Sequence, residues 1–292
     1  MKLFKLDIDE IWKLSCRDIR DGFMRNRKKY LGIILLVLIF FFNFKIQVNA
    51  YYGGNIYSAS FMDLAVYVCK GKVYFNPDAR TKYEIPFMWL AIQMYIAYLI
   101  GDYASEDRTK LGQQYILRST HMGNWLAGKW VYCVFNCLLF YAIMFAVCFA
   151  VTVPISHSIF AIHEELNLVT SCLHIARHTT FDLYRGVFIM PVLTSILFSF
   201  AQVIMQLMVK PIFSYLGILF YSLLSDYVLS YFLIGNYSMI VRNIQENAVD
   251  GIVNSAKFID PSRGILIEVI CMSVLFVAGQ CLLRKYDYLE RE

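Results

Sequence analysis

Residues 25–48 read RNRKKYLGIILLVLIFFFNFKIQV, a basic cluster followed by a mainly apolar run that begins at Tyr30. A helix rises about 1.5 Å per residue, so a run of roughly 20 apolar residues crosses a bilayer core of about 30 Å. The run from Tyr30 to Val48 has that length, and basic residues collect on the cytoplasmic side of membrane helices. The stretch therefore predicts a membrane-spanning helix whose beginning faces the cytoplasm.

The composition of the whole chain extends this interpretation. Of its 292 residues, 59% are apolar and only 17% are charged, and the mean hydropathy is +0.52. Soluble domains carry about 25% charged residues. Five further apolar runs occur, at 85–102, 128–153, 186–209, 211–235 and 264–283. We therefore predict an all-α integral membrane protein with six transmembrane helices, a multi-pass protein of the cell membrane.

The N-terminal tail, residues 1–29, is amphipathic. Apolar side chains recur every three or four positions from Leu3 to Leu14, among charged ones, which predicts a helix. We expect it to lie in the inner membrane interface with Trp12 at the headgroups; a soluble cytoplasmic helix is the alternative. With this tail inside, Lys and Arg number 17 on inner segments and 9 on outer segments. This bias predicts cytoplasmic termini and one six-span domain over 30–292.

The predicted topology leaves three segments outside the membrane: 50–84, 154–185 and 236–263. His174 and His178 are four apart, so a helix would place them close enough to share a metal; a solvated helix face is the alternative. Cys69 and Cys172 both fall on outer segments and could pair in an oxidising exterior. An N-x-S glycosylation pattern begins at Asn236.

Residues 123–130, GNWLAGKW, fit the phosphate-loop pattern G-x-x-x-x-G-K, except that Trp130 replaces the hydroxyl residue that binds Mg²⁺. A working phosphate loop follows a buried strand and opens a soluble helix, whereas this stretch runs into a transmembrane segment. We therefore exclude a nucleotide site here. Lys129 is interpreted instead as a cationic anchor at the membrane surface, with Trp125 and Trp130 as interface aromatics.

The longest inner connection covers about residues 103–127. It contains a charged stretch at 106–108 (EDR), a bend at 118–120 (RST), and an entry into the next span at 125–129 (WLAGK). This arrangement resembles the connection between the second and third spans of type 2 ABC transporter permeases. RTKLG at 108–112 stands where the family commonly has a Gly-Thr pair. An ordinary solvated connector is the alternative interpretation.

The resemblance covers most of the chain. It includes the interfacial N-terminal helix, the six spans, and the cationic ending LRKYDYL at 283–289. In the first outer segment, FMD at 61–63 and KGK at 70–72 precede Ile85 and Pro86, which is similar to permeases of Gram-positive bacteria. A bacterial plasma membrane is the location that this similarity implies.

Several functional expectations follow from the resemblance alone. It implies the permease subunit of an ATP-driven ABC transporter, which exports a peptide, lipid-like or drug-like substrate by alternating access. Two such chains, identical or homologous, would meet among membrane lipids, and each would dock a cytoplasmic ABC ATPase that binds ATP and Mg²⁺. The chain itself would be no enzyme, hold no cofactor and bind no nucleic acid. The residues expected to contact the ATPase are Glu106, Asp107, Arg108, Thr109, Gln113 and Arg118.

Polar side chains inside the predicted spans are the candidates for a substrate path. Such groups usually face a bundle interior or an aqueous path. Ser195 begins a stripe along one face of the fourth span, and Asp226 is interpreted as the only acid deep within a span. Hydrogen bonds between helices are the alternative role, and for Asp226 a charge at a pore or dimer interface. The path candidates are Ser199, Gln202, Gln206, Ser222, Ser225 and Asp226, with Gln93 and Asn136 as further possibilities.

Two other function classes stay open at this point. A multi-span membrane enzyme would use the histidines of the second outer segment as a metal site, although the sequence shows no nucleophile–base pair. A secondary transporter would show internal repeats and broken helices near the membrane midplane, and the sequence shows neither convincingly. A bound ATPase subunit would favour the ABC permease, whereas protein-bound zinc without such a subunit would favour the enzyme.

Overall fold

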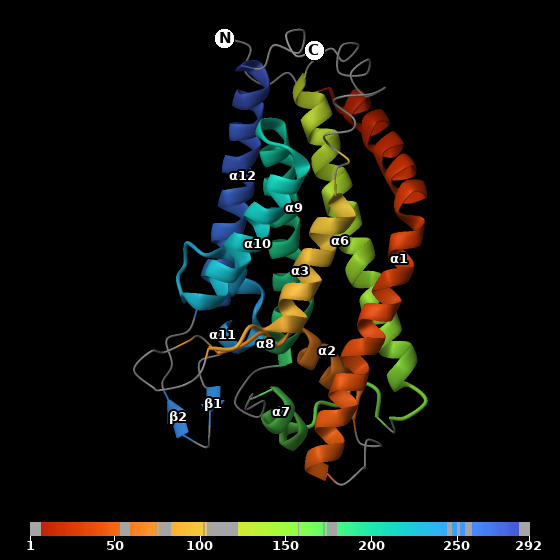
Figure 1. Cartoon of the computed structure of the whole chain (residues 1–292), viewed down its shortest axis with the longest axis vertical. Helices are drawn as coiled ribbons and strands as arrows, with labels where there is room; N and C mark the ends of the chain where they lie inside the picture. The colour runs from red at the N-terminus through yellow and green to blue at the C-terminus, as the bar shows by residue number, and fades with distance from the viewer. Residues whose placement is uncertain are drawn as a thin grey trace.

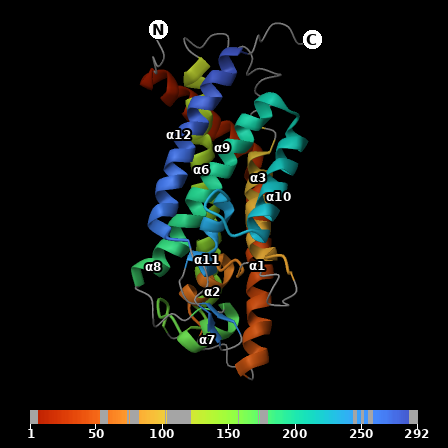
Figure 2. The same ribbon diagram turned by 90° about the vertical axis from the view of Figure 1, so that its left-hand side faces the viewer.

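The computed structural model describes most of the chain as a helical bundle (Figures 1 and 2). The first residue of α1 and the last of α12 lie at the same end of this bundle, at the top of Figure 1. The described residues are 7–52, 59–73, 75, 83–101, 103, 122–156, 158–171, 173, 180–243, 247–249, 252–254 and 259–285.

Four helical segments are long and apolar enough to cross a membrane. They are Ile8–Ala50, Gly123–Thr152, Phe181–Met208 and Pro261–Leu283. The first belongs to α1 (Ile8–Tyr52), the second to α6 (Met122–Thr152) and the fourth to α12 (Pro261–Lys285). The third joins α8 (Thr180–Tyr184), the π-helical turn η4 (Arg185–Ile189) and α9 (Met190–Met208). The prediction of a multi-pass helical membrane protein is thus confirmed.

The second and fifth predicted spans form shorter helices than the other four. α3 (Phe87–Ile100) has 14 residues and α10 (Pro211–Tyr227) has 17. At 1.5 Å per residue they reach about 21 and 26 Å, which is less than a bilayer core of about 30 Å. They pack against each other in the upper part of the bundle in Figure 1. The structure therefore supports four full-length crossings rather than six equal ones.

Helix α1 joins the amphipathic tail to the first span without interruption. Figure 2 shows its first turns lying across the top of the bundle before the helix descends. Along these turns Ser15, Asp18 and Asn26 are buried against the protein, while Trp12 is 68% exposed. The predicted helix is therefore present, and the side that packs on the bundle includes the polar residues Ser15, Asp18 and Asn26.

The stretch GNWLAGKW lies within the first turns of α6, so it is a helix and not a phosphate-binding loop. Gly128 faces the beginning of α1, where a Cβ atom would lie 3.3 Å from Cβ of Leu14. The absence of a side chain at this position lets α1 and α6 approach closely. Trp125 is buried, which argues against its prediction as an interface aromatic, and Trp130 is half-buried beside the rings of Phe200 and Phe276.

The lower end of the bundle in Figure 1 is closed by short elements. These are α2 (Phe61–Cys69), α7 (Glu164–Ser171), the 3₁₀ turn η5 (Ile234–Ser238), α11 (Ile240–Asn243), and the hairpin of β1 (Asn247–Val249) and β2 (Ile252–Asn254). The hairpin is antiparallel and pairs Ala248 with Val253. It is an addition to the predicted all-α fold.

Asp63 joins α2 to α7 in this lower region. Its fully buried carboxylate accepts hydrogen bonds from the Ser60 backbone N–H (2.9 Å), the His163 backbone N–H (3.0 Å) and Asn167 Nδ2 (2.6 Å). Nδ1 of His163 lies 2.7 Å from Oδ2 of the same carboxylate. The Ser60 hydroxyl accepts from the Asp63 N–H, which completes a capping box at the start of α2. Two segments that are far apart in sequence, and that are predicted to lie outside the membrane, are thus docked on one acid.

We expect Asp63→Asn to lower the free energy of unfolding by about 1–3 kcal/mol, because an amide NH₂ would face buried donors that now share a carboxylate. Thermal unfolding of the purified protein in detergent measures the change. Asp182→Asn is the matched control, since Asp182 is partly exposed and pairs with Arg185 only one turn away. A loss of equal size in both variants would contradict a special role for Asp63.

Candidate functional site

The polar stripe predicted on the fourth span lies on α9 and faces α3. Nε2 of Gln202 donates to the Ala97 carbonyl at 3.0 Å, and Nε2 of Gln206 donates to the Gly101 carbonyl at 2.5 Å. Ala97 lies in the last turn of α3 and Gly101 caps its end; the Ala97 carbonyl also accepts the Gly101 N–H at 2.9 Å. Both glutamines are buried, so in this conformation they hold the end of α3 against α9.

The serines of the same stripe bond to neighbouring helices. The hydroxyl of Ser195 lies 3.1 Å from Oε1 of Gln93 on α3 and 2.9 Å from the Tyr141 hydroxyl on α6. The Ser199 hydroxyl lies 3.3 Å from the Cys137 sulfur, also on α6. The sequence spacing therefore identified one continuous seam where α9, α3 and α6 meet. Its role as a substrate path stays a prediction.

The remaining path candidates lie at the end of α10. Asp226 is buried, and its Oδ2 accepts a hydrogen bond of 2.6 Å from the Tyr83 hydroxyl. Its Oδ1 lies 3.1 Å from Nη2 of Arg242 on α11, in an ion pair that is almost completely buried. The Ser225 hydroxyl bonds to the Tyr221 carbonyl one turn earlier. Ser222 is also buried, and its hydroxyl has no hydrogen-bond partner among the residues that the structure describes.

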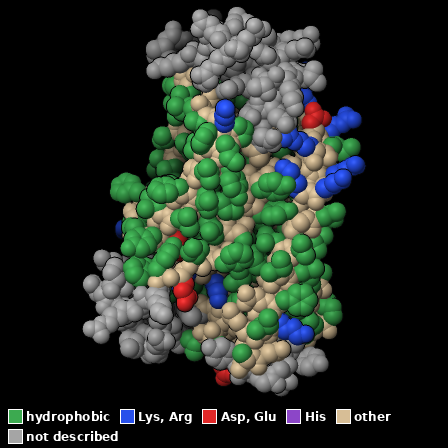
Figure 3. All heavy atoms as spheres, in the orientation of Figure 1, with side chains coloured by type: hydrophobic (Ala, Val, Ile, Leu, Met, Phe, Trp, Pro, Cys, Tyr) green, Lys and Arg blue, Asp and Glu red, His purple; other side chains and the backbone are tan. Residues whose placement is uncertain are grey.

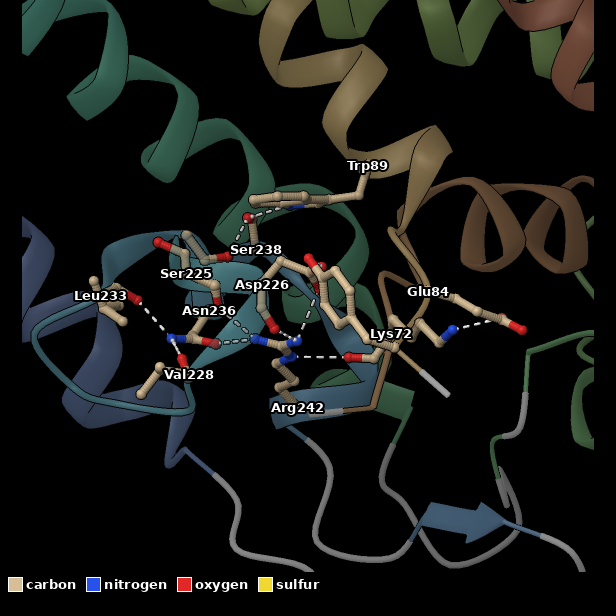
Figure 4. A network of polar contacts seen from close by, with 12 residues as sticks. Lys72, Glu84, Trp89, Ser225, Asp226, Val228, Leu233, Asn236, Ser238 and Arg242 are labelled. Atoms are coloured by element: carbon tan, nitrogen blue, oxygen red, sulfur yellow. Dashed lines mark hydrogen bonds and ion pairs between the residues drawn. The ribbon is translucent and has the colours of Figure 1, made fainter. Parts of the chain in front are cut away.

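Arg242 is the centre of this second network (Figure 4). Its Nη1 donates to the Ser225 carbonyl at 2.6 Å and to Oδ1 of Asn236, while Nη2 also donates to the Asp226 carbonyl at 2.6 Å. Its Nε donates to the Lys72 carbonyl at 2.8 Å. The planar guanidinium thus joins the end of α10, η5 and the segment after α2. Burial lowers the pKa of Arg242 to about 10, and the nearby Asp226 opposes that shift, so the group stays charged at neutral pH.

The segment after α2 reaches Arg242 through a sharp bend at Gly71. This glycine has φ +67°, and an added Cβ would lie 2.5 Å from the Cβ of Met239, so neither the backbone conformation nor the space there suits a side chain.

Asn236 is fully buried, and its amide donates to the Val228 and Leu233 carbonyls, both at 3.0 Å. The N-x-S pattern at this position therefore does not present a glycan acceptor in the folded protein.

A third buried network lies at the opposite end of the bundle, around Asp18 of α1. Nζ of Lys129 on α6 lies 2.9 Å from Oδ2 of Asp18, and both side chains are at most 1% exposed. The Tyr103 hydroxyl donates to Oδ1 of Asp18 at 3.2 Å, and Arg17 pairs with the same oxygen at 2.5 Å. Lys129 also lies 4.0 Å from the ring centroid of Tyr103. The prediction of Lys129 as a surface anchor is wrong, because Asp18 draws it into the protein.

The expected ATPase contacts lie outside the described residues: Glu106, Asp107, Arg108, Thr109, Gln113 and Arg118. The proposed histidine pair, His174 and His178, and the cysteine Cys172 also lie outside them. Cys69 is buried in α2 as a free thiol. Within the described ranges, no group of three or more His, Cys, Asp or Glu side chains could hold a metal ion.

Arg242 and Glu268 are among the buried charges that the sequence reasoning missed. Arg242 is the only charged residue in the stretch SMIVRN at 238–243 and directly follows three apolar residues. This position could have indicated that its charge is buried and paired. Glu268 interrupts the apolar run GILIEVICM at 264–272 and is fully buried on α12, so Asp226 is not the only deep acid. An ionisable residue within a predicted span is a recognised signal of function, and the sequence shows one at Glu268.

Comparisons with protein-family models, with curated proteins and with solved structures give no match to this chain.

Proposed function

We propose that this chain is the permease subunit of an ATP-driven ABC transporter of the type 2 class, powered by a separate cytoplasmic ATPase. The observation that carries the proposal is the position of Asp18. It contacts Tyr103, where the connection after α3 begins, and Lys129, about two turns into α6 beyond the connection. A partner that pushed this connection would move α1 and α6 together, because one buried carboxylate ties both Tyr103 and Lys129 to α1.

The end of the bundle that holds Asp18 also supports an orientation of the subunit in the membrane. Figure 3 shows Lys and Arg side chains gathered over the beginning of α1 and hydrophobic side chains covering the middle of the same face. Basic residues favour the cytoplasmic side. We therefore place the 104–121 connection, the beginning of α1 and the end of α12 in the cytoplasm. The short helices α3 and α10 complete six passes in this proposal.

The proposed path for the substrate is the seam between α9 and α3. Gln202 and Gln206 hold this seam closed through bonds to backbone carbonyls, and such bonds between membrane helices contribute about 0.6 kcal/mol each. Bonds of that strength can be broken and remade during a transport cycle. Parting of the seam would expose a polar stripe along α9 to a peptide, lipid-like or drug-like compound. A second permease chain, a copy or a paralogue, would complete the path.

The proposal is tested by co-purification from the native host. A tagged chain extracted in mild detergent should retain a subunit with a complete phosphate loop and ATPase activity, whereas the chain purified alone should hydrolyse no ATP. The triple variant Glu106→Ala, Asp107→Ala, Arg108→Ala should lower the retained ATPase by about tenfold, equivalent to about 1.4 kcal/mol of binding free energy. Glu164→Ala with Glu165→Ala, at the other end of the bundle, is the control and should retain it.

Labelling of single cysteines introduced at 105 and 116 tests the orientation. A membrane-impermeant maleimide added to intact cells should leave both unlabelled and should label both after the cells are opened. Labelling in intact cells would place the 104–121 connection outside and would overturn the proposal. ATP hydrolysis by the isolated chain would overturn it as well.

A further inference from the structure

Glu268 is a buried carboxyl group that the proposed transport mechanism does not use. It lies on α12, is 0% exposed, and faces α9, where the Thr194 hydroxyl donates to its Oε1 at 2.5 Å. Its second oxygen, Oε2, has no hydrogen-bond partner in the described part of the chain. This arrangement differs from Asp63, Asp226 and Asp18, whose carboxylates are all surrounded by donors or cations.

The surroundings of Glu268 offer no compensation for a negative charge. The titratable groups that act on it are Tyr237 of η5 and Cys271 of α12, and neither carries positive charge. On α9 its contact is Thr194, while α6 meets α12 further along, where Trp130 packs near Phe276. Two cations lie near the start of α12. Arg185 of η4 bonds Ser262, about 9 Å before Glu268 along the axis, and the side chain of Arg263 is 74% exposed and pairs with Asp260.

A carboxylate in such a place would cost several kcal/mol of desolvation, and buried acids avoid this cost by binding a proton. The protonated form buries no net charge, which removes the largest part of this cost. Its carbonyl oxygen, Oε1, accepts from Thr194, and Oε2 carries the acidic hydrogen. A proton is also the smallest cation, and it fits a side chain that is completely enclosed.

The packing around Glu268 links its protonation to the contact between two helices. Gly264, one turn earlier on α12, brings the helix against α9 and η5; a Cβ there would lie 3.1 Å from the Met190 side chain and 3.3 Å from the Tyr237 ring. Further along, Gly279 faces Ile204 of α9 at 3.4 Å. Water can therefore reach Glu268 only when α9 and α12 separate.

We propose that Glu268 is a proton-binding site, occupied while α9 and α12 are packed together and emptied when they part. Ionisation then requires hydration, so release of the proton favours the separated arrangement, and uptake favours the closed one. The ambient proton concentration would thus bias the α9–α12 contact. The inference holds whichever substance crosses the membrane and whether or not an ATPase drives the protein.

The proton on Glu268 can be observed by infrared spectroscopy of the full-length protein in lipid nanodiscs. The wild type should show the C=O stretch of a protonated, buried carboxylic acid at neutral pH, and Glu268→Gln should lack it. Asp226→Asn is the matched control: Asp226 is equally buried but paired with Arg242, so its removal should leave the band in place. A wild-type spectrum identical to that of Glu268→Gln in this region would overturn the proposal.

The link to helix packing is tested by thermal unfolding at a series of pH values. The folded protein holds a proton that the unfolded, hydrated carboxyl releases, so the stability of the wild type should fall as the pH rises. Glu268→Gln, a neutral side chain of the same shape, should remove this part of the pH dependence. If both proteins lose stability in parallel as the pH rises, the group is not a proton site coupled to packing.

Discussion

Replacing Arg242 by alanine is expected to lower the free energy of unfolding by about 3–5 kcal/mol, the loss typical of removing one partner from a buried ion pair. The variant leaves the Asp226 carboxylate without its cation, inside the protein. It also removes the donors that now satisfy the carbonyls of Ser225 and Lys72. Arg242 joins these groups, which lie at the end of α10 and in the segment after α2, so the lower end of the bundle should open before the spans separate.

Two further variants separate charge from geometry at this site. Arg242→Lys keeps the positive charge but has no planar fork to reach five acceptors, and we expect an intermediate loss. Adding Asp226→Asn to Arg242→Ala removes the unpaired carboxylate and should restore part of the stability. Arg263→Ala is the surface control. That side chain is 74% exposed and pairs loosely with Asp260, so its loss should change stability by less than about 0.5 kcal/mol.

Thermal unfolding in detergent, followed by the fraction of protein that remains monodisperse, measures these effects. Limited proteolysis adds a local readout, because new cleavage in Arg242→Ala should begin between residues 228 and 260 rather than in the spans. An Arg242→Ala protein as stable as Arg263→Ala would show that the network contributes nothing to the fold. It would also reopen the interpretation of Asp226 as a free charge lining a path.

Lys129→Met is the second change with a large expected effect, again about 3–5 kcal/mol. The ammonium group is completely buried between α1 and α6, and its removal leaves Asp18 with only the partly exposed Arg17 as a cation. The methionine fills a similar volume, so the loss measures charge rather than a cavity. Asp18→Asn should cost a comparable amount, because it removes the carboxylate that pairs with the buried Lys129.

The double variant Asp18→Asn, Lys129→Met completes a mutant cycle. It should be more stable than the sum of the single effects predicts, since no isolated buried charge remains on either helix. Lys72→Ala is the control, because the Lys72–Glu84 pair is exposed and should contribute at most about 1 kcal/mol. Strictly additive effects in the cycle would mean that Asp18 and Lys129 act independently.

The helices were predictable from the sequence to different degrees. Runs of apolar residues identified α1, α6, α9 and α12, because length and hydropathy alone decide which helices cross a membrane. The early end of α10 was not predictable. The helix stops at Tyr227 because Arg242, on a later segment, binds the carbonyls of its last turn. The residues of α10 themselves do not indicate this contact.

The polar contacts were predictable only in part. The spacing of Ser195, Ser199, Gln202 and Gln206 correctly placed them on one face, since a helix repeats every 3.6 residues. Their partners include backbone carbonyls at the end of α3. Every residue has such a carbonyl, so the residue types could not indicate these partners. Lys129 was misplaced for a related reason: near a span boundary a lysine is usually at the surface, and its pairing with Asp18 depends on how α1 crosses α6.

The pairing of Asp18 with Lys129 has a consequence for biogenesis. The ribosome releases α1 well before α6, so Asp18 has Arg17 but not Lys129 as a cation while α2 and α3 are synthesised. During this interval the first turns of α1 have no bundle to pack against, so we expect them to stay hydrated at the membrane surface. Emergence of Lys129 would then draw the tail onto the bundle, making the arrival of α6 the event that completes insertion of the N-terminal half.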